Sequence, residues 1–237
     1  MLTISNWASA SSYQWDIIIE GMRNPMNSWD KQDSRWDAFG DADGYSFGDN
    51  DLALMRKLTK AGPDHRKFMR MIPVWITITA PLYWWKEFDT YKVGTTTNSC
   101  STMHKIHAKD FVLDDFSHEN LEELALGSLM ETIKVMNVYR DLYIQTKEKR
   151  YWKQLIELLP TSYNQRRTVY LNYETLYNIY HARRNHKLNE WHTLCDFITK
   201  LPLAELITGG DTDVWHPTNK ITNQRRNLRT TTRITHY

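Results

Sequence analysis

The sequence predicts a helix-rich α+β fold with few strands, built as a single domain. Three observations indicate this fold class: apolar residues recur at helical spacing along most of the second half, only one segment is rich in β-branched residues, and no low-complexity linker divides the chain. The 237 residues are 41% hydrophobic and 24% charged, which excludes a disordered, collagen-like or coiled-coil protein. We expect the domain to span residues 1–208 and a basic extended tail to span 209–237.

The first half of the chain carries one strand and two helices, after a mixed segment over 1–49 with no clear element. A helix is expected over 51–60, because apolar residues recur there at helical spacing and Gly62-Pro63 follows as a stop signal. The segment 71–79 is β-branched and partly alternating, which predicts a strand. A proline suited to a first helical turn then favours a helix over 82–91.

The second half is predicted to be helical after a Thr-, Asn- and Ser-rich loop over 94–102. A long helix is expected from Ser117, its N-cap, to about residue 146. The row expected to face the core is Leu121, Leu124, Leu129, Ile133, Met136, Tyr139 and Tyr143. The remaining predicted helices are 151–159, 171–183 and 188–200.

Composition also limits the cell compartment and the partners. No apolar run approaches the roughly 20 residues that span a bilayer, and the N-terminus lacks the layout of a signal peptide, so no membrane contact is expected. Cys100 and Cys195 are too few for a disulfide framework, which favours a reducing, cytoplasmic location. A formal net charge of +2 does not indicate binding to nucleic acid.

The tail over 209–237 is the one strongly basic segment. It carries five basic residues against two acidic ones: Lys220, Arg225, Arg226, Arg229 and Arg233 against Asp211 and Asp213. Such a tail could be an arm that reaches a neighbouring subunit or an anionic ligand, or it could simply be solvated. Because it is the sole feature that favours nucleic acid, a nucleic-acid partner is not expected.

Several common kinds of site are excluded because the sequence lacks their motifs. The chain has no phosphate-binding glycine motif of the P-loop or Rossmann type and no nucleophile elbow. Cys100, His104 and His107 offer sulfur and imidazole groups, but their spacing fits no standard zinc site and a fourth ligand is missing. The sequence therefore predicts no metal site.

The most informative block is the late helical segment around residues 171–183. Asn172 and Arg183 share a helical face, and Asn178 lies beside it. Amides match the polar edge of a base or flavin ring, and the adjacent Arg183 and Arg184 offer planar forks for phosphate or a carbonyl oxygen. The competing interpretation is that both arginines only complement the negative end of the helix dipole.

The order of these elements, with the Asn-x5-Asn-x4-Arg block, resembles the flavin-dependent thymidylate synthase family over roughly residues 50–200. The resemblance implies a small antiparallel sheet flanked by helices and a cytoplasmic homotetramer with sites built between subunits. It also implies a flavoprotein methyltransferase of nucleotide biosynthesis, which converts dUMP to dTMP. FAD would be its cofactor, and NADPH and methylenetetrahydrofolate its cosubstrates. By position, Asn172 and Asn178 match residues at the flavin, and Arg183 matches the arginine that holds the pyrimidine.

The family signature, Arg-His-Arg with a following Ser loop, is degraded in this chain. It falls on Thr90, Tyr91 and Lys92, and Glu87 replaces the preceding Gln. The expected cofactor-binding residues are Asn172, Asn178, Lys92 and Lys187. The expected substrate-binding residues are Arg183, also the expected catalytic residue, Arg184, Glu87, Ser99 and Cys100.

Two functions therefore stay open at the level of sequence. In the first, the protein is a divergent enzyme that still binds FAD and a pyrimidine nucleotide. In the second, the fold is kept without thymidylate synthesis, and the chain is a nucleotide-binding or protein-binding module or acts on another pyrimidine nucleotide.

Overall fold

The computed structural model describes residues 1–36 and 44–210. The strands are β1 (Thr3–Ser9), β2 (Arg35–Trp36), β3 (Tyr45–Ser46), β4 (Pro73–Pro81), β5 (Thr96–Ser99) and β6 (Asn164–Asn172). The helices are α1 (Ser12–Arg23), α2 (Asp49–Lys60), α3 (Leu82–Phe88), α4 (Glu123–Thr146), α5 (Lys149–Leu158), α6 (Tyr173–Arg183), α7 (Asn189–Ile198) and α8 (Glu205–Thr208). The predicted helix-rich α+β class is confirmed. The basic tail lies outside the described residues, except for Gly209 and Gly210.

The main sheet has four antiparallel strands in the order β1-β4-β6-β5, and β2 and β3 form a separate two-stranded sheet. The predicted strand over 71–79 is β4. Its partner β6 was not predicted, and the expected helix over 171–183 begins only at Tyr173 because Asn172 is still paired with Pro73. Strand β5 likewise lies in the segment 94–102, which was predicted to be a loop.

The elements near the N-terminus, β1, α1, β2 and β3, were also missed. Strand β1 pairs with β4, and α1 follows it directly. A capping box begins α1: the Ser11 side chain accepts from the backbone N–H of Gln14, and the Gln14 side chain accepts from that of Ser11. The capping box was readable from the sequence, but the mixed composition around it hid the signal.

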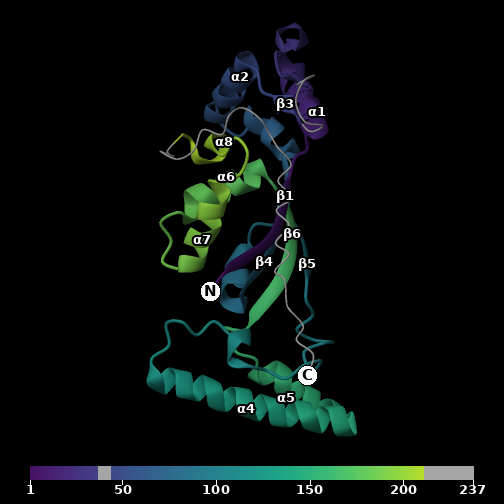
Figure 1. The fold of residues 1–237 in the computed structure, drawn as a ribbon, viewed down its shortest axis with the longest axis vertical. Coiled ribbons are helices and arrows are strands. Elements are labelled where there is room, and N and C mark those ends of the chain that lie inside the picture. Colours follow the sequence, from purple (N-terminus) through teal and green to yellow (C-terminus); the bar gives the residue numbers. More distant parts are fainter. Residues whose placement is uncertain (37–43, 211–237) are drawn as a thin grey trace, which may run out of the picture.

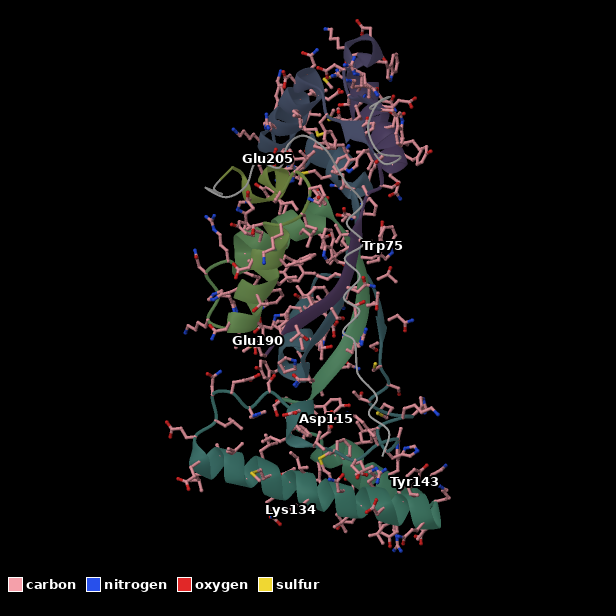
Figure 2. All side chains as sticks on the ribbon, viewed as in Figure 1. Trp75, Asp115, Lys134, Tyr143, Glu190 and Glu205 are labelled. Atoms are coloured by element: carbon pink, nitrogen blue, oxygen red, sulfur yellow. The ribbon has the colours of Figure 1, made fainter. Side chains whose placement is uncertain are left out.

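One face of the main sheet is covered by helices. Figure 1 shows α6 and α7 along one side of β1, β4 and β6, with α1 and α2 at one end of the sheet. Val74, Ile76 and Ile78 of β4 point into the large core beneath these helices. The opposite face carries Trp75, which is 40% exposed and packs against Tyr170 (Figure 2).

A second, smaller core lies at the other end of the sheet, where α4 and α5 pack together (Figure 1). Its buried members are Ile106, Phe111, Phe116, Leu129, Ile133, Met136 and Leu155. None of the helices in the described ranges is both long and apolar enough to span a bilayer.

The start of α4 corrects two sequence predictions. The helix begins at Glu123, and Ser117 is not its N-cap, because the Ser117 hydroxyl instead donates to Asn164 Oδ1 at 2.8 Å. Leu121 and Leu124, expected to face the core, are 39% and 87% exposed. The chain before α4 is therefore anchored to the start of β6.

Candidate functional site

The Arg183 side chain is held by a polar and aromatic network. Its Nη1 lies 2.9 Å from Glu87 Oε2, and its Nε donates to the Tyr91 hydroxyl at 3.0 Å. The same carboxylate oxygen accepts from Trp191 Nε1 at 3.0 Å and lies 3.4 Å from His186 Nε2. The guanidinium carbon also sits 4.8 Å from the centre of the Trp191 ring. The Arg183 guanidinium therefore already bonds to protein groups, Glu87 and Tyr91.

Three elements bring this network together. Arg183 ends α6, Glu87 lies in the last turn of α3, and Trp191 is buried in the first turn of α7. The structure thus joins Glu87 and Arg183, which the sequence analysis both placed among the candidate substrate-binding residues. However, the carboxylate neutralises the guanidinium that was expected to face the substrate.

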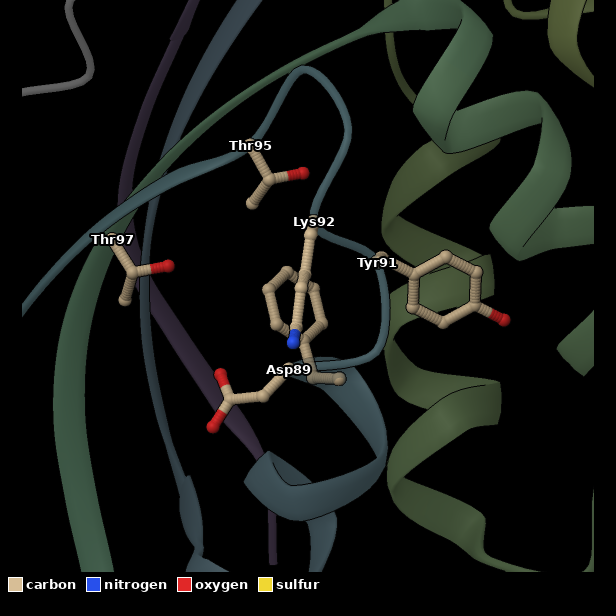
Figure 3. Close-up of a pocket in the computed structure, with 6 residues that line it drawn as sticks. Asp89, Tyr91, Lys92, Thr95 and Thr97 are labelled. Carbon is tan, nitrogen blue, oxygen red and sulfur yellow. The ribbon is translucent and has the colours of Figure 1, made fainter.

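Next to the network lies a pocket of about 150 Å³. Its lining residues are Phe88, Asp89, Tyr91, Lys92, Thr95 and Thr97. Figure 3 shows Lys92 reaching into the pocket between Tyr91 on one side and Thr95 and Thr97 on the other. Tyr91 therefore forms a wall shared by the pocket and the Arg183 network.

Some polar groups of the pocket have hydrogen-bond or ion-pair partners in the protein and others have none among the described residues. Asp89 accepts from Arg167 Nη1 at 2.8 Å, so its charge is balanced. Lys92 is exposed and has no ion-pair partner in the described part of the chain. The Thr95 hydroxyl oxygen is buried and has no hydrogen-bond partner among residues 1–36 and 44–210. A buried hydroxyl without a partner costs free energy, and a ligand that hydrogen-bonds to it would recover that cost.

The turn that carries Lys92 and Thr95 rests on the start of α6. Asn172 is the N-cap of α6, and its Oδ1 accepts from the Thr175 backbone N–H at 3.0 Å. The Thr175 hydroxyl donates to the Val93 carbonyl at 3.1 Å. Gly94 has φ +69°, and a Cβ there would come within 2.5 Å of Asn172 Nδ2. Asn172 therefore lies against the turn that carries Lys92 and Thr95.

The other expected site residues lie elsewhere. Lys92 alone among them lines the pocket, whereas Asn178, Arg184, Lys187, Ser99 and Cys100 are exposed and outside its lining. Sequence reasoning missed Asp89, Thr95 and Thr97. Tyr91 was recognised only as a signature replacement, and no local signal marks Trp191 and His186, because their role depends on α7 packing against α3.

The pocket is smaller than the flavin that the resemblance implies. A cavity of about 150 Å³ holds one benzene-sized ring. This space suits one small ring or a phosphate group and is too small for the three-ring flavin of FAD. The pocket within one chain therefore does not fit FAD.

The histidines near Cys100 form no metal site in the structure. His107 packs edge-on against Tyr143, with the ring centres 4.8 Å apart. No group of three His, Cys, Asp or Glu residues within the described ranges could hold a metal ion.

Comparisons with known proteins establish the fold. No protein-family model matches the sequence, and a search of curated proteins finds no relative. Solved structures do match. Thymidylate synthase X from Helicobacter pylori, solved with FAD and dUMP, has 15% identity and a TM-score of 0.57 over 86% of this chain and 94% of its own. A second structure of that enzyme with FAD and dUMP has 14% identity and a TM-score of 0.57, over 86% of this chain and 95% of its own.

A third match comes from a different enzyme. The UMP/dUMP methylase PolB from Streptomyces cacaoi, bound with 5-Br dUMP, has 12% identity and a TM-score of 0.59, over 88% of this chain and 94% of its own. At such low identities the likeness shows the fold alone. The chain thus has the fold of flavin-dependent thymidylate synthases, as the sequence resemblance predicted.

Proposed function

We propose that this protein binds a pyrimidine nucleotide at the pocket beside Lys92 and is a divergent enzyme that reductively methylates dUMP to dTMP. One observation carries the proposal: Lys92 and an unsatisfied buried hydroxyl line a small polar pocket at the segment that the resemblance assigns to the family signature. The structural neighbours support this choice of ligand, since they were solved with dUMP or 5-Br dUMP.

The chemistry of the pocket matches the edge of a uracil ring. Uracil presents two carbonyl acceptors and one N–H donor. The Lys92 ammonium and the Thr95 hydroxyl can donate, and the Asp89 carboxylate can accept. Phe88 and Tyr91 supply aromatic walls for a flat ring. Lys92 is equally suited to the nucleotide phosphate, because its charge is unpaired within the described residues.

The proposed enzyme also needs a binding site for FAD. Because FAD does not fit the pocket of one chain, it would bind where another copy completes the site, with Asn178 and Lys187 exposed on the surface that copy would cover. We propose the homotetramer on this ground, with NADPH and methylenetetrahydrofolate as cosubstrates. A cytoplasmic location agrees with the two free cysteines, Cys100 and Cys195.

A second candidate function is favoured by the Glu87 carboxylate. This carboxylate accepts a hydrogen bond from the guanidinium of Arg183, the residue that the resemblance assigns to the pyrimidine. If this contact persists with nucleotide bound, Arg183 cannot polarise the ring. The protein would then be a nucleotide-binding relative without thymidylate synthesis.

Calorimetric titration with dUMP tests the nucleotide site. Lys92→Ala is expected to weaken dUMP binding by about tenfold or more, since a hydrogen bond to a charged group contributes about 1.5–3 kcal/mol. Lys86→Ala removes the same charge from an exposed position on α3 and is expected to leave affinity unchanged. Equal dUMP affinity in Lys92→Ala and the parent would reject this site.

Absorbance of the purified protein separates the two functions. The enzyme is expected to be yellow or to take up added FAD, and to form dTMP from dUMP with the two cosubstrates. Protein that binds dUMP but neither takes up FAD nor forms dTMP would select the second function.

A further inference from the structure

The segment 100–111, between β5 and α4, is fastened to the pair formed by α4 and α5. Trp152 Nε1 of α5 donates to the Met103 carbonyl at 2.9 Å. Asn137 of α4 accepts from the backbone N–H of Phe111 and donates to its carbonyl, both at 2.9 Å. Between these two attachments, Ile106 is 4% exposed and belongs to the smaller core. The residues on either side of Ile106 are therefore held close to these helices.

His107 lies in this segment against one side of α4. Its ring packs edge-on against Tyr143, which Figure 2 shows towards one end of α4. Arg140 lies three residues before Tyr143 and Lys147 four residues after it, so the three side chains share one side of the helix. Lys147 Nζ lies 6.0 Å from the centre of the Tyr143 ring. His107 therefore faces a stretch of α4 that carries two cations.

Positive charge gathers around His107. Burial is the largest reason why the pKa of its imidazole falls below the usual value of 6.5. The positive charges of Lys147, Lys105 and Arg140 lower this pKa further. Lys105 and Lys147 are exposed and have no carboxylate partner in the part of the chain that the structure describes. Cations from the segment 100–111 and from α4 therefore converge on one imidazole without full compensation by carboxylates.

Two nitrogen atoms in this group are buried and have no hydrogen-bond partner among residues 1–36 and 44–210. They are His107 Nδ1 and Arg140 Nε. The Arg140 guanidinium binds carboxylates through Nη1, which lies 2.6 Å from Asp110 and 2.7 Å from Asp141. Its Nε–H is a separate donor that these contacts leave unused. A buried donor without an acceptor costs free energy, which a bound acceptor would recover.

We propose that His107 and the facing side of α4 form a binding site for a phosphate group. A phosphate group carries a charge of about −1.5 to −2 near neutral pH and has acceptor oxygens in several directions, which suits donors from both a loop and a helix. His107 and Arg140 supply the N–H groups, and Lys105 and Lys147 supply the opposite charge. None of these residues lines the pocket beside Lys92, so either site can fail without the other.

Nuclear magnetic resonance of the histidine side chains measures binding at this site in the full chain. The His107 signal is the one that disappears in His107→Gln. Inorganic phosphate, added at constant ionic strength, is expected to shift this signal until the site is saturated. Lys105→Ala is expected to weaken the binding about tenfold, because it removes a charged donor. Lys134→Ala removes the same charge from an exposed position on α4 and is expected to leave the affinity unchanged.

Several outcomes of this titration would overturn the proposal. One is a His107 signal that does not move with phosphate, and another is equal phosphate affinity in Lys105→Ala and the parent. Lys92→Ala is expected to show the same His107 shift as the parent. A shift that is lost in Lys92→Ala would assign the phosphate to the pocket beside Lys92 and remove the second site. Thermal unfolding of each variant shows whether the chain is still folded.

Three ligands identify the source of the phosphate group. Free phosphate and the phosphate of a nucleotide share the chemistry that this site would recognise. Tighter binding of dUMP than of inorganic phosphate at the His107 signal would indicate a nucleotide, and the reverse order would indicate the free anion. Deoxyuridine has the base and sugar of dUMP without its phosphate, and it is expected to leave the signal unshifted. A deoxyuridine shift equal to that of dUMP would contradict a phosphate site.

The pH titration of the His107 signal supplies an independent check. An anion beside the ring favours the charged imidazolium, so saturating phosphate is expected to raise the pH at the midpoint of this titration. The carboxylates nearest to the group, Asp110 and Asp141, are already paired with Arg140. A midpoint that stays the same or falls when phosphate is bound would contradict an anion next to His107.

Discussion

The contact between Glu87 and Arg183 decides how much positive charge the candidate site offers to a ligand. Both side chains are partly exposed, 35% for Glu87 and 21% for Arg183. Solvent therefore screens the ion pair, and another charged group can replace either partner. A nucleotide phosphate or a uracil carbonyl would have to compete with the carboxylate for the guanidinium. Lys92 has no such internal competitor in the described part of the chain.

Replacing Glu87 tests this competition. Glu87→Gln keeps an oxygen that can accept from Trp191 Nε1 but removes the negative charge beside Arg183. We expect dUMP to bind several-fold tighter, because an anion no longer faces a carboxylate. Titration calorimetry measures the change, and Glu157→Gln, an exposed site on α5, is the matched control. If Glu87→Gln and the parent bind dUMP equally, Glu87 does not compete with the ligand.

Among the elements, the junction of β6 with α6 shapes the candidate pocket. The strand ends where Asn172 caps the helix, and the same side chain lies under the turn at Gly94. A helix cap thus supports the turn that lines the pocket, and this turn can approach Asn172 so closely only because Gly94 has no side chain.

Gly94→Ala is expected to lower the free energy of unfolding and to weaken dUMP binding. A positive φ already costs an alanine about 1 kcal/mol, and the new Cβ would also press on Asn172. Gly209→Ala is the control, because it has φ +81° but its Cβ would meet only His181, at an ordinary 3.9 Å. Urea unfolding should show the larger loss for Gly94→Ala. Equal losses would mean that the turn is free to move off Asn172.

For the molecule as a whole, a buried ion pair joins α1 to α2 within the N-terminal region. Arg23 of α1 and Asp51 of α2 are 3% and 0% exposed, and Arg23 Nε donates to Asp51 at 2.6 Å. Asp51 also accepts from the backbone N–H groups of Asp33 and Ser34. Burial alone would raise the Asp51 pKa, but the hydrogen bonds from Ser34, Arg23 and Asp33 outweigh it and hold this pKa below its usual value of 3.8.

The ion pair predicts both a mutational effect and a pH effect. Asp51→Asn is expected to lower the free energy of unfolding by about 3–5 kcal/mol, because it leaves Arg23 buried without its counter-ion. Since the folded-state pKa is lowered, the stabilisation from Asp51 is complete above the unfolded pKa of 3.8 and is lost as pH falls through the folded value. Urea unfolding near neutral pH and in acid measures both effects. Asp30→Asn, at an exposed position, should be neutral. A neutral Asp51→Asn would show that the pair contributes nothing.

The sequence alone indicated the helix-rich class, strand β4 and most helices after residue 50. It also named Lys92 as a candidate site residue, and Lys92 lines the pocket. These features depend on local periodicity and composition, which a single segment carries by itself. The sequence did not indicate β5 and β6. A polar strand such as β6 becomes recognisable only when it pairs with β4, and the edge strand β5 only when it pairs with β6.

The sequence by itself determined which helices can form and which chemical groups the chain can bring to a site. Only the tertiary structure decided that Glu87, 96 residues from Arg183, would meet its guanidinium, and that the Thr95 hydroxyl would be buried without a partner. The physical reason is that charge pairing and burial depend on distances in space, and the packing of α3, α6 and α7 sets those distances.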